Sequence, residues 1–550
     1  MGRRDLLLLI AIVFLAFMFR FYRVAENPPA LNWDEISIGY NAYSILKTGK
    51  DEWGEVFPVH FQAYGEYKLP AQIYASIPGI ALLGLNELGV RITPVVYGTL
   101  TVLITFFLTR IIFQSNIIGL LASFLLAISP WHIHLTRASF ESSFAVFWIV
   151  LGFWWLIKGF EDKKWWILSM IPLALSIYTY NSARVFTPIF IITTILIFRK
   201  TFLKSPRIIV LSAITLIILL LPLVPYYLSG EGNARYKLVS ITDDPGFVLR
   251  INEYRGSSTL PSPLPRLIYN KLTYGAFVIS QNYLTHFSPD FLFISGAPHK
   301  QHHVQGVGEL YLFQAPFVLI GFLFLFRKKI QFRWFLISWL LLAFVPVSVT
   351  NDSIPHALRT LIAVPVYQLI SAFGLYEAYL LFKPRRINLS PLFMIMVVVV
   401  ISLSVSFYLQ NYFQKYAKLY SRDWQYGYKQ AVEYIKEHQQ DYDEIIFTRH
   451  YGEPQMFTLF YLQFDPVRFQ NNPNLIRFKT YDWVRVLRFD KFYFPDLSDK
   501  ETRYVDIINQ NPDRRLLFIG KPGDFPFGQH ILKTINFLDG QVAFEIVEVK

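Results

Sequence analysis

Apolar residues form long runs that recur from the N-terminus to about residue 409. The first run extends from Leu6 to about Phe21, and the others lie at about 91–113, 117–130, 142–158, 166–179, 185–198, 208–228, 309–326, 334–349, 360–382 and 391–409. A membrane-spanning helix needs about 20 apolar residues, and soluble proteins do not contain so many runs approaching that length. The pattern predicts a polytopic α-helical membrane protein with about 11 (roughly 9–13) transmembrane helices.

The pattern changes after about residue 410. Segment 411–550 is charged, with a helical stretch near 423–438 and strand-like runs at 444–448, 515–520 and 542–547. Apolar positions in short β-rich runs, with a helix between them, are typical of a soluble α/β domain. We therefore expect a transmembrane domain over 1–410 and a soluble domain of about 140 residues, large enough for its own core.

Composition narrows the class of protein. The chain has 550 residues, of which 53% are apolar and 17% charged, where soluble proteins carry about 25% charged residues. This excludes a disordered, collagen-like or ordinary cytosolic protein. The formal charge of +13 does not indicate nucleic-acid binding, because Lys and Arg stand in short clusters between the apolar runs. The absence of cysteine excludes disulfides, a thiolate nucleophile and cysteine-ligated zinc.

The basic clusters predict the topology. They fall in alternate loops, at 158–164, 199–207 and 327–333 and at Lys383, Arg385 and Arg386. Cytoplasmic loops are rich in Lys and Arg, so these loops and the N-terminus are expected in the cytoplasm, with an uncleaved first helix. The opposite, extracytoplasmic side then holds the loops richest in Asp, Glu, His, Tyr and Arg, and the C-terminal domain: 25–90, 131–141, 229–308, 350–359 and 411–550. We expect the chemistry on that face of a prokaryotic plasma membrane.

The first of these loops carries an acidic pair, Asp34 and Glu35, at the start of a stretch with helical apolar spacing. The spacing predicts an amphipathic helix at the membrane interface. Asp34 is then either a helix N-cap, with Glu35 interacting with the helix dipole, or a functional carboxylate. The same loop ends in a second charged cluster, Glu66 and Lys68. Lys68 is either part of a functional site or a lysine that merely extends its ammonium group toward the membrane interface.

The second loop contains His132, His134, Arg137 and Glu141. The two histidines fit a metal site or an aromatic belt at the membrane surface. Arg137 and Glu141 are four residues apart and could form an ion pair on a helix. Glu141 opens an apolar run, where an ionisable side chain is costly and therefore indicates function.

Two further loops place cations at membrane depth. Arg184 follows Tyr180 and Asn181, and His356 and Arg359 close the last loop. The planar guanidinium group of arginine suits phosphate because it donates two parallel hydrogen bonds. Either arginine could instead be the structural partner of an acidic group. The long loop 229–308 adds a histidine cluster at 299–303, which we interpret as part of a cap over the site rather than as a zinc site.

The order of these motifs resembles one family. Asp34 and Glu35 early in the first loop, Glu66-Tyr67-Lys68-Leu69-Pro70 at its end, and Glu141 in the second loop are similar to the bacterial protein O-mannosyltransferase-like and aminoarabinose-transferase-like group of polyprenyl-phosphate-dependent glycosyltransferases. The stretches YTYNSARVFTP, HFSPDFLF and HALR look like members of the same group. The resemblance covers roughly residues 1–410.

The resemblance implies a GT-C membrane fold and a transferase that takes a sugar from a polyprenyl-phosphate carrier at the extracytoplasmic face. It implies that Asp34 is the general base for the acceptor hydroxyl, that Lys68 binds the donor phosphate, and that Glu141 is the second acidic residue. The family often has two prolines after the lysine, whereas Leu69-Pro70 follows here and Tyr67 separates Glu66 from Lys68. The role of Glu66 therefore stays open.

The chemistry of a glycosyl phosphate requires one base and several cations, because the phosphate is already a good leaving group. We expect these site residues, in the order catalytic, phosphate-binding and substrate-positioning: Asp34, Glu35 and Glu141; Lys68, Arg184, His356 and Arg359; Glu66, Tyr180, Asn181 and Arg137. A single displacement would invert the sugar; Glu141 as a nucleophile would give a covalent intermediate instead, although a role in metal binding or positioning is favoured. No cofactor is certain, and a divalent metal stays open, with candidates Asp34, Glu141, His302 and His303.

Several functions remain in competition. The leading hypothesis is transfer of a hexose or pentose from a polyprenyl-phosphate donor to a lipid, protein or glycan acceptor; no nucleotide-binding motif is apparent, which fits a lipid-linked donor. The nearest alternative is a lipid-linked oligosaccharide transferase or glycan ligase. A transporter or flippase would place charges at mid-membrane in paired broken helices, and an assembly protein would leave the clustered loop charges unexplained.

Overall fold

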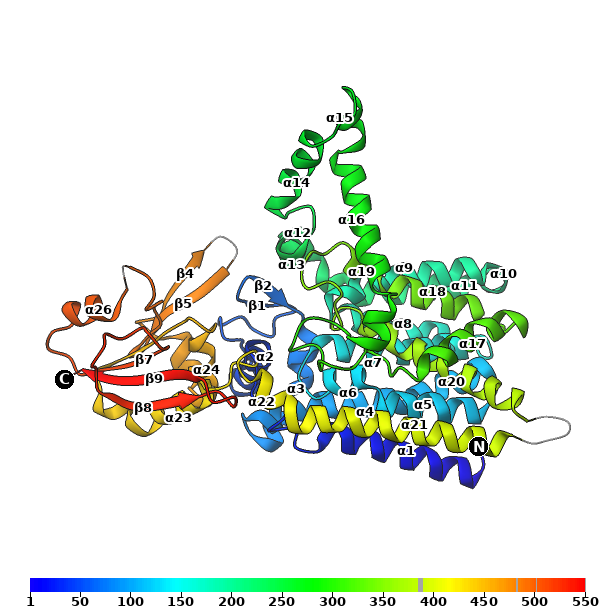
Figure 1. Ribbon diagram of the computed structural model, residues 1–550, viewed down its shortest axis with the longest axis horizontal. Helices are drawn as coiled ribbons and strands as arrows, with labels where there is room; N and C mark the ends of the chain where they lie inside the picture. Colours follow the sequence, from blue (N-terminus) through cyan, green and yellow to red (C-terminus); the bar gives the residue numbers. More distant parts are fainter. Residues whose placement is uncertain (384–388, 481–482, 501, 550) are drawn as a thin grey trace. The chain divides into compact units, whose positions relative to one another are not determined.

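The computed structural model in Figure 1 describes residues 1–383, 389–480, 483–500 and 502–549. The chain forms two compact units, and the segments of each are not contiguous in sequence. Unit 1 comprises Met1–Tyr22, Pro94–Thr136 and Glu141–Asn411, and unit 2 comprises Arg23–Thr93, Arg137–Phe140 and Tyr412–Lys550. The change of unit between Asn411 and Tyr412 lies close to the expected boundary at residue 410, but residues 23–93 and 137–140, which were expected in the first domain, pack with the C-terminal segment. Arg385 and Arg386 of the last expected basic cluster lie outside the described residues.

Unit 1 is helical, and every expected apolar run coincides with a helix. Its main helices are α1 (Arg3–Phe21), α4 (Glu87–Phe113, which begins in unit 2), α5 (Asn116–Ile128), α6 (Pro130–Leu135), α7 (Glu141–Lys158), α8 (Lys164–Ile177), α9 (Asn181–Ile197), α10 (Arg199–Phe202), α11 (Pro206–Leu220), α12 (Val224–Leu228), α13 (Ala234–Val239), α14 (Pro245–Gly256), α15 (Leu264–Ile268), α16 (Lys271–Thr285), α17 (Gln314–Arg327), α18 (Arg333–Ala343), α19 (Val345–Ser348), α20 (Val364–Leu381) and α21 (Ser390–Gln410). A short π-helical turn, η3, covers Asp290–Ile294.

Among the described residues, five helices are long and apolar enough to cross a membrane: Glu87–Phe113, Glu141–Lys158, Pro206–Leu228, Leu361–Leu381 and Ser390–Tyr420. Six further apolar helices have 10–17 residues. The expectation of a membrane-spanning helical chain is thus supported, whereas the count of 11 crossings is not established by the helix lengths.

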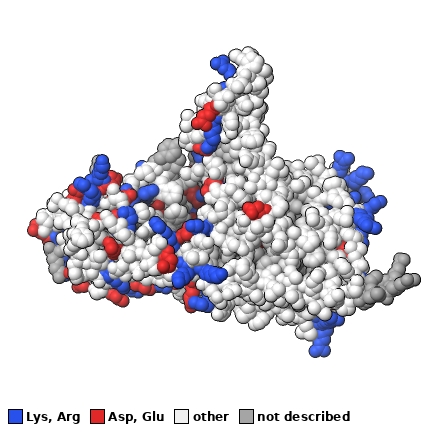
Figure 2. Space-filling view, in the orientation of Figure 1, with Lys and Arg blue, Asp and Glu red and all other residues white. Residues whose placement is uncertain are grey.

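Burial separates central from peripheral helices. In Leu361–Leu381, 94% of the apolar window is buried, against 11% in Pro206–Leu228. Helix α20 packs very closely on α17 at Gly374. A Cβ atom at this position would lie 1.8 Å from the carbonyl oxygen of Phe317, so only glycine fits. Small residues at such crossings let apolar helices approach without a hydrophobic driving force between them. Figure 2 shows Lys and Arg gathered at the end of unit 1 where α10 and the N-terminus lie.

Unit 2 contains a mixed seven-stranded sheet of order β4-β5-β6-β3-β7-β9-β8. The strands are β3 (Glu444–Phe447), β4 (Ile476–Thr480), β5 (Trp483–Phe489), β6 (Phe492–Tyr493), β7 (Leu516–Gly520), β8 (Ile531–Asn536) and β9 (Val542–Val549). Strand β3 is parallel to β6 and β7, and the other pairs are antiparallel. The helices after residue 411 are α22 (Ala417–Tyr420), α23 (Tyr428–His438), α24 (Pro454–Tyr461), α25 (Pro466–Gln470) and α26 (Tyr504–Gln510). The predicted α/β character of this segment, its helix and its three strands are confirmed.

The first long loop supplies two helices and a two-stranded hairpin to unit 2. Helix α2 spans Trp33–Thr48, strands β1 (Phe61–Ala63) and β2 (Glu66–Lys68) form a hairpin, and α3 spans Pro70–Leu83. The predicted helix is confirmed as α2, but it is not buried on one face alone, because ten of its residues are buried. A Cβ atom on Gly39 would lie 2.6 Å from the ring of Phe460 in α24, so the second face of α2 is covered by the C-terminal segment.

Candidate functional site

The structure joins the two charged clusters of the first long loop. Lys68 ends β2, and its Nζ lies 2.5 Å from Oδ1 of Asp34 in the first turn of α2. The side chain of Lys68 is 2% exposed and that of Asp34 is 31% exposed. The ammonium group therefore holds the carboxylate from the buried side, while the carboxylate itself remains reachable by a substrate.

Glu35, the other member of the acidic pair, is enclosed. Its two carboxylate oxygens each accept a hydrogen bond of 2.9 Å from Arg91, and neither side chain is exposed. They also accept from the backbone N–H groups of Asn32, at 3.2 Å, and Ser139, at 3.0 Å. Asn32, not Asp34, is the N-cap of α2, in a capping box completed by Glu35. These contacts favour a positioning role for Glu35, because a fully bonded buried carboxylate has no lone pair left for a substrate proton.

Arg137 is also engaged in unit 2. It donates to the carbonyl oxygen of Asn27, at 2.6 Å, and to the hydroxyl of Tyr412, at 3.2 Å, and lies over the Tyr412 and Phe413 rings. It therefore fixes segment 137–140, whose Ser139 reaches Glu35. Glu66 is half-buried opposite Ala63 in the β1–β2 hairpin.

Three aromatic rings gather beside Asp34. Trp33 lies 6.1 Å from Tyr64 and 6.2 Å from Trp483, and Tyr64 stacks on Trp483 at 5.9 Å. The backbone N–H of Val484 also donates to the carbonyl of Tyr64, which ties the hairpin to β5. Sequence reasoning missed this cluster because Trp483 is remote in the chain and no short motif connects it with Trp33.

Glu52 is a buried acid of unit 2 whose negative charge is incompletely compensated. Glu52 accepts a hydrogen bond of 3.2 Å from Asn41. Burial raises the pKa of Glu52 to about 7, against the opposing effect of the Asn41 hydrogen bond. Nothing in the spacing of the first loop singles out this residue, and one of its contacts, from Arg477 Nη2 to its carbonyl oxygen at 3.2 Å, comes from the remote C-terminal segment.

A second polar cluster forms within unit 1 around Arg359. This side chain is almost buried and donates to Thr350 Oγ1, at 2.8 Å, and to Asp352 Oδ2, at 2.7 Å. Burial lowers the pKa of Arg359, and Tyr180 lies near enough to affect it. The structure thus brings Arg359 close to the expected residue Tyr180.

Histidines surround this arginine. The rings of His299 and His302 stack at 3.8 Å, and His302 lies 5.0 Å from His356. His286 Nε2 accepts from the backbone N–H of His356 while its Nδ1 faces the carbonyl of Asn282, which defines a neutral tautomer. Burial lowers the pKa of His286 to about 4, and burial with Arg359 lowers that of His356. At neutral pH the rings of His286 and His356 therefore act as neutral hydrogen-bonding groups, and Arg359 supplies positive charge to this cluster.

Arg184 is incompletely paired. Its Nη1 donates to Asn181 Oδ1 at 3.2 Å, and its guanidinium lies over the rings of Tyr226 and Tyr227. Its Nε and Nη2 are buried, and neither has a hydrogen-bond partner among the residues that the structure describes. A half-buried cation with two enclosed donor nitrogens that make no hydrogen bond to the described residues is suited to binding an anion.

The metal candidates do not form a recognisable centre. His303 Nδ1 lies 2.9 Å from Glu309 Oε1, and its Nε2 faces the carbonyl of Val307. Burial opposes protonation of His303, but the carboxylate of Glu309 outweighs it and raises the pKa. Glu141 begins α7 and is half-buried. Among the described residues, no group of three or more His, Asp or Glu side chains is arranged to hold a metal ion.

The two histidines of the second loop, His132 and His134, also have hydrogen-bond partners. His132 Nδ1 accepts from Arg20 of α1 at 2.6 Å, and His134 Nε2 lies 2.8 Å from the carbonyl of Gln301. They fasten α6 to its neighbours within unit 1.

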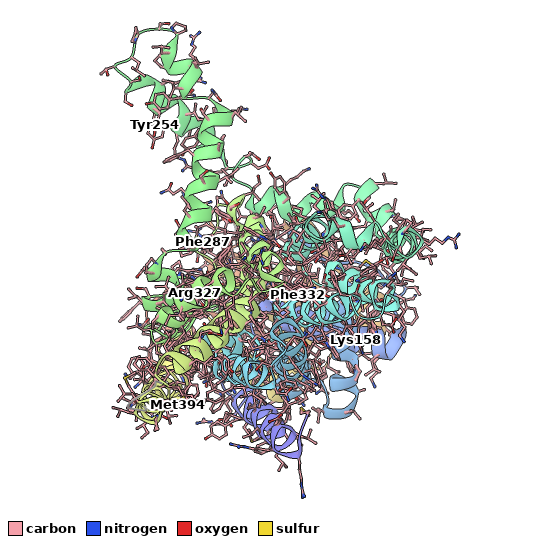
Figure 3. All side chains as sticks on the ribbon, turned by 90° about the vertical axis from the view of Figure 1, so that its right-hand side faces the viewer. Lys158, Tyr254, Phe287, Arg327, Phe332 and Met394 are labelled. Atoms are coloured by element: carbon pink, nitrogen blue, oxygen red, sulfur yellow. The ribbon has the colours of Figure 1, made fainter. Side chains whose placement is uncertain are left out.

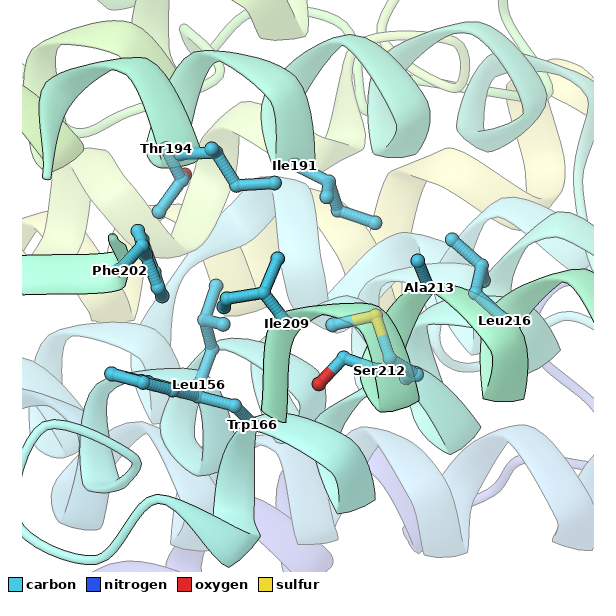
Figure 4. A pocket seen from close by; sticks show the side chains of 11 residues that line it. Leu156, Trp166, Ile191, Thr194, Phe202, Ile209, Ser212, Ala213 and Leu216 are labelled. Atoms are coloured by element: carbon cyan, nitrogen blue, oxygen red, sulfur yellow. The ribbon is translucent and has the colours of Figure 1, made fainter. Parts of the chain in front are cut away.

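Figure 4 shows an apolar cavity of about 110 Å³ within unit 1. It is enclosed by α7, α8, α9, α10 and α11, with Trp166, Met170 and Phe202 among its lining residues. Apart from the hydroxyls of Thr194 and Ser212 its lining side chains are apolar, so it offers contacts to hydrocarbon rather than acid–base chemistry.

Comparison with known proteins gives a partial match in sequence. The model of the dolichyl-phosphate-mannose-protein mannosyltransferase family matches residues 10–231. Comparison with curated protein sequences finds no match.

Comparison with solved structures shows the fold. ArnT from Cupriavidus metallidurans in the apo state has a TM-score of 0.54 and 12% identity, over 99% of this chain and 97% of ArnT. The same protein bound to undecaprenyl phosphate has a TM-score of 0.52 and 12% identity, over 100% of this chain and 98% of ArnT.

The archaeal oligosaccharyltransferase AglB from Archaeoglobus fulgidus, in complex with an inhibitory peptide and a dolichol-phosphate, has a TM-score of 0.53 and 14% identity. The match covers 87% of this chain but only 62% of AglB, so the chain spans less than two thirds of that protein. The expected GT-C-like fold, with membrane-type helices and a C-terminal sheet domain, is confirmed, and the matches agree with the family resemblance.

Proposed function

We propose that this chain is an integral-membrane glycosyltransferase that moves a sugar from a polyprenyl-phosphate donor to an acceptor hydroxyl. The observation that carries the proposal is the reachable carboxylate of Asp34 held by the buried ammonium of Lys68, at 2.5 Å. The fold shared with ArnT, which has been solved with undecaprenyl phosphate, supports the choice of donor. The polar loops and the C-terminal domain are proposed to be extracytoplasmic, because Lys and Arg, which mark the cytoplasmic side, gather at the end of unit 1 where α10 and the N-terminus lie.

Asp34 is proposed as the general base. Lys68 is bound to Oδ1, so Oδ2 can take the proton of the acceptor hydroxyl while its oxygen attacks the anomeric carbon. The bond from that carbon to the phosphate oxygen breaks, and polyprenyl phosphate leaves with its electron pair. One displacement of this kind inverts the configuration of the sugar. Glu35 and Arg137 serve by fixing the N-terminus of α2 and segment 137–140.

The phosphate is proposed to be bound by cations and neutral histidines. Arg184 contributes the two nitrogens that have no partner among the described residues, and Asn181 orients it. Arg359 and His356 contribute from their own cluster, and Tyr180 lies beside Arg359. Lys68, whose Nζ is bound to Asp34, is proposed to contribute its positive charge to the same phosphate. Such donors stabilise the charge that develops on the leaving group.

Four further residues are proposed to have supporting roles. Glu141 is proposed to position the acceptor or to bind a divalent metal, and Glu66 to orient substrate beside Lys68. His302 and His303 are proposed to support the histidine cluster, since His303 is occupied by Glu309. The likeness of the fold to AglB keeps oligosaccharide transfer as the second candidate.

The test is sugar transfer by the purified chain in nanodiscs from labelled polyprenyl-phosphate monosaccharides, with donor binding measured in parallel. Asp34→Asn is expected to bind donor normally and to lose about 100-fold or more of the transfer rate, because general-base catalysis contributes about that much. Lys68→Ala is expected to weaken both binding and turnover. Asp539→Asn and Lys436→Ala, at exposed positions, are the matched controls.

The outcomes separate the candidates. Normal turnover by Asp34→Asn would place the base elsewhere. Transfer from a lipid-linked oligosaccharide, with no transfer from monosaccharide donors, would favour the second candidate. Movement of the lipid-linked sugar across the bilayer without release of polyprenyl phosphate would favour a flippase.

A further inference from the structure

Helices α14, α15 and α16, residues 245–285, form an arm of unit 1. Figures 1 and 3 show it projecting sideways from the helix bundle, across the direction in which α5 and α21 run, with Tyr254 near its outer end and Phe287 at its base. A small core of Phe247, Ile251 and flanking residues joins α14 to α16. The arm is therefore a helical hairpin, and part of the expected cap over 229–308 projects away from the helix bundle.

The base of the arm is fastened to α18 and the segment after α19. Asn282 Nδ2 donates to the carbonyl of Thr350 at 2.8 Å, and the hydroxyl of Tyr283 donates to that of Leu341 at 2.9 Å. The next residue after α16 is His286, which accepts from the backbone N–H of His356. The arm thus continues directly into the cluster around Arg359.

The outer part of the arm exposes large apolar side chains. The tip, which we define as Leu264–Leu272, includes Leu267 at 69% and Leu272 at 81% exposure, with Leu264 and Ile268 also exposed. Along α16, Phe277 and Leu284 are exposed too. So many large, exposed apolar side chains on one short segment are rare on a monomer in water and mark a surface that something else covers.

The charge of the arm identifies the covering partner. Residues 245–285 contain Arg250, Arg255, Arg266 and Lys271 but only one acid, Glu253. Leucine, tyrosine and basic residues together on short helices are typical of segments that lie in the membrane interface and favour anionic lipids. The excess of cations disfavours a second arm as the partner, because like charges would meet.

We propose that the arm lies on the membrane surface, with the tip among the headgroups and upper acyl chains of an anionic leaflet. Its direction supports this choice, because an arm crossing the direction of the bundle helices runs along a bilayer rather than away from it. Through His286 the docked arm fixes the depth of His356 and Arg359 relative to the lipid phosphates. The inference stands on the arm alone and is independent of the proposed transferase activity.

The absence of cysteine from the chain allows a clean test. Leu267→Cys and Val505→Cys would each carry an environment-sensitive fluorophore, in large nanodiscs that contain phosphatidylglycerol. Val505 is exposed on α26, outside the arm, and serves as the control. The label at 267 is expected to be quenched several-fold more by lipid-attached nitroxides than by iodide, and the label at 505 to show the reverse. Strong quenching of the 267 label by iodide, with none by the nitroxides, overturns the proposal.

Two further measurements test whether anionic lipid is what covers the tip. The double variant Arg266→Gln, Lys271→Gln is expected to weaken nitroxide quenching at 267, and so is replacement of phosphatidylglycerol by phosphatidylcholine. Unchanged quenching in both would overturn the anionic part of the proposal. Protection from both quenchers, with crosslinking between two 267 positions, would show that a second copy covers the tip and would overturn the lipid assignment.

Discussion

Glu35 in unit 2 and Arg184 in unit 1 are both ionic side chains with enclosed charged atoms, but they differ in how many of their hydrogen-bonding groups have a partner. Glu35 meets four donors, two of them from Arg91, and has no free lone pair for a ligand. Arg184 has one hydrogen-bonded nitrogen and two buried nitrogens without a partner among the described residues. The difference shows which charge holds the structure together and which is suited to a ligand.

Glu52 completes the comparison. It too is a buried charge with incomplete compensation, but a carboxyl can accept a proton, and its pKa is raised to about 7. Arginine cannot lose its proton at physiological pH. An undercompensated buried carboxylate therefore neutralises itself, whereas an undercompensated buried arginine depends on an anion.

The largest effect on stability is expected from breaking the ion pair between Glu35 and Arg91. Arg91→Leu leaves Glu35 buried without its cation and should destabilise unit 2 by about 3–5 kcal/mol. Thermal unfolding of the purified chain, followed through tryptophan fluorescence, measures the change. The double variant Glu35→Leu, Arg91→Leu should recover part of the loss, because it removes the unpaired charge. A single variant as stable as the wild type would show that Glu35 is not structural.

The next largest effect is a dependence of the stability of unit 2 on pH, caused by Glu52. Its pKa in the folded chain is above that of an unfolded glutamate, so the folded state loses stability as the pH rises from about 4.5 to about 7. Unit 2 should be less stable at pH 8 than at pH 5 through this residue, by up to about 3 kcal/mol. Glu52→Gln should remove most of this slope, as measured by unfolding across the pH range. Glu55→Gln, which alters a nearby acid, is the control, and an unchanged slope in Glu52→Gln would contradict the assignment.

The smallest effect is expected at the undercompensated arginine. Arg184→Gln should weaken binding of a polyprenyl phosphate about 10- to 100-fold, since hydrogen bonds to a charged group contribute about 1.5–3 kcal/mol. It should leave unfolding unchanged or slightly improved, in contrast to Arg91→Leu. Binding isotherms and thermal unfolding on the same samples decide this. Arg207→Gln, an exposed arginine, is the control; loss of stability without loss of binding would make Arg184 structural.

Local patterns were sufficient to predict the helices of unit 1 and the α/β character of residues 411–550. Apolar runs and alternation report which residues leave water, and this follows from side chains close together in the sequence. The order of Asp34, Glu66, Lys68 and Glu141 was likewise sufficient to suggest the family. The pattern failed at α2, whose apolar spacing predicts one buried face, because a remote helix covers the other.

Apolar spacing and composition are thus enough to predict the membrane-type helices, the C-terminal α/β segment and the residue types available for chemistry. The packing of residues 23–93 with 412–550, the contact of Asp34 with Lys68 and the ion pair of Glu35 with Arg91 are visible only in the folded chain. This is because ion pairing and burial depend on distance in space. Side chains 34 and 56 residues apart meet through hydrogen bonds that no spacing rule along the chain encodes.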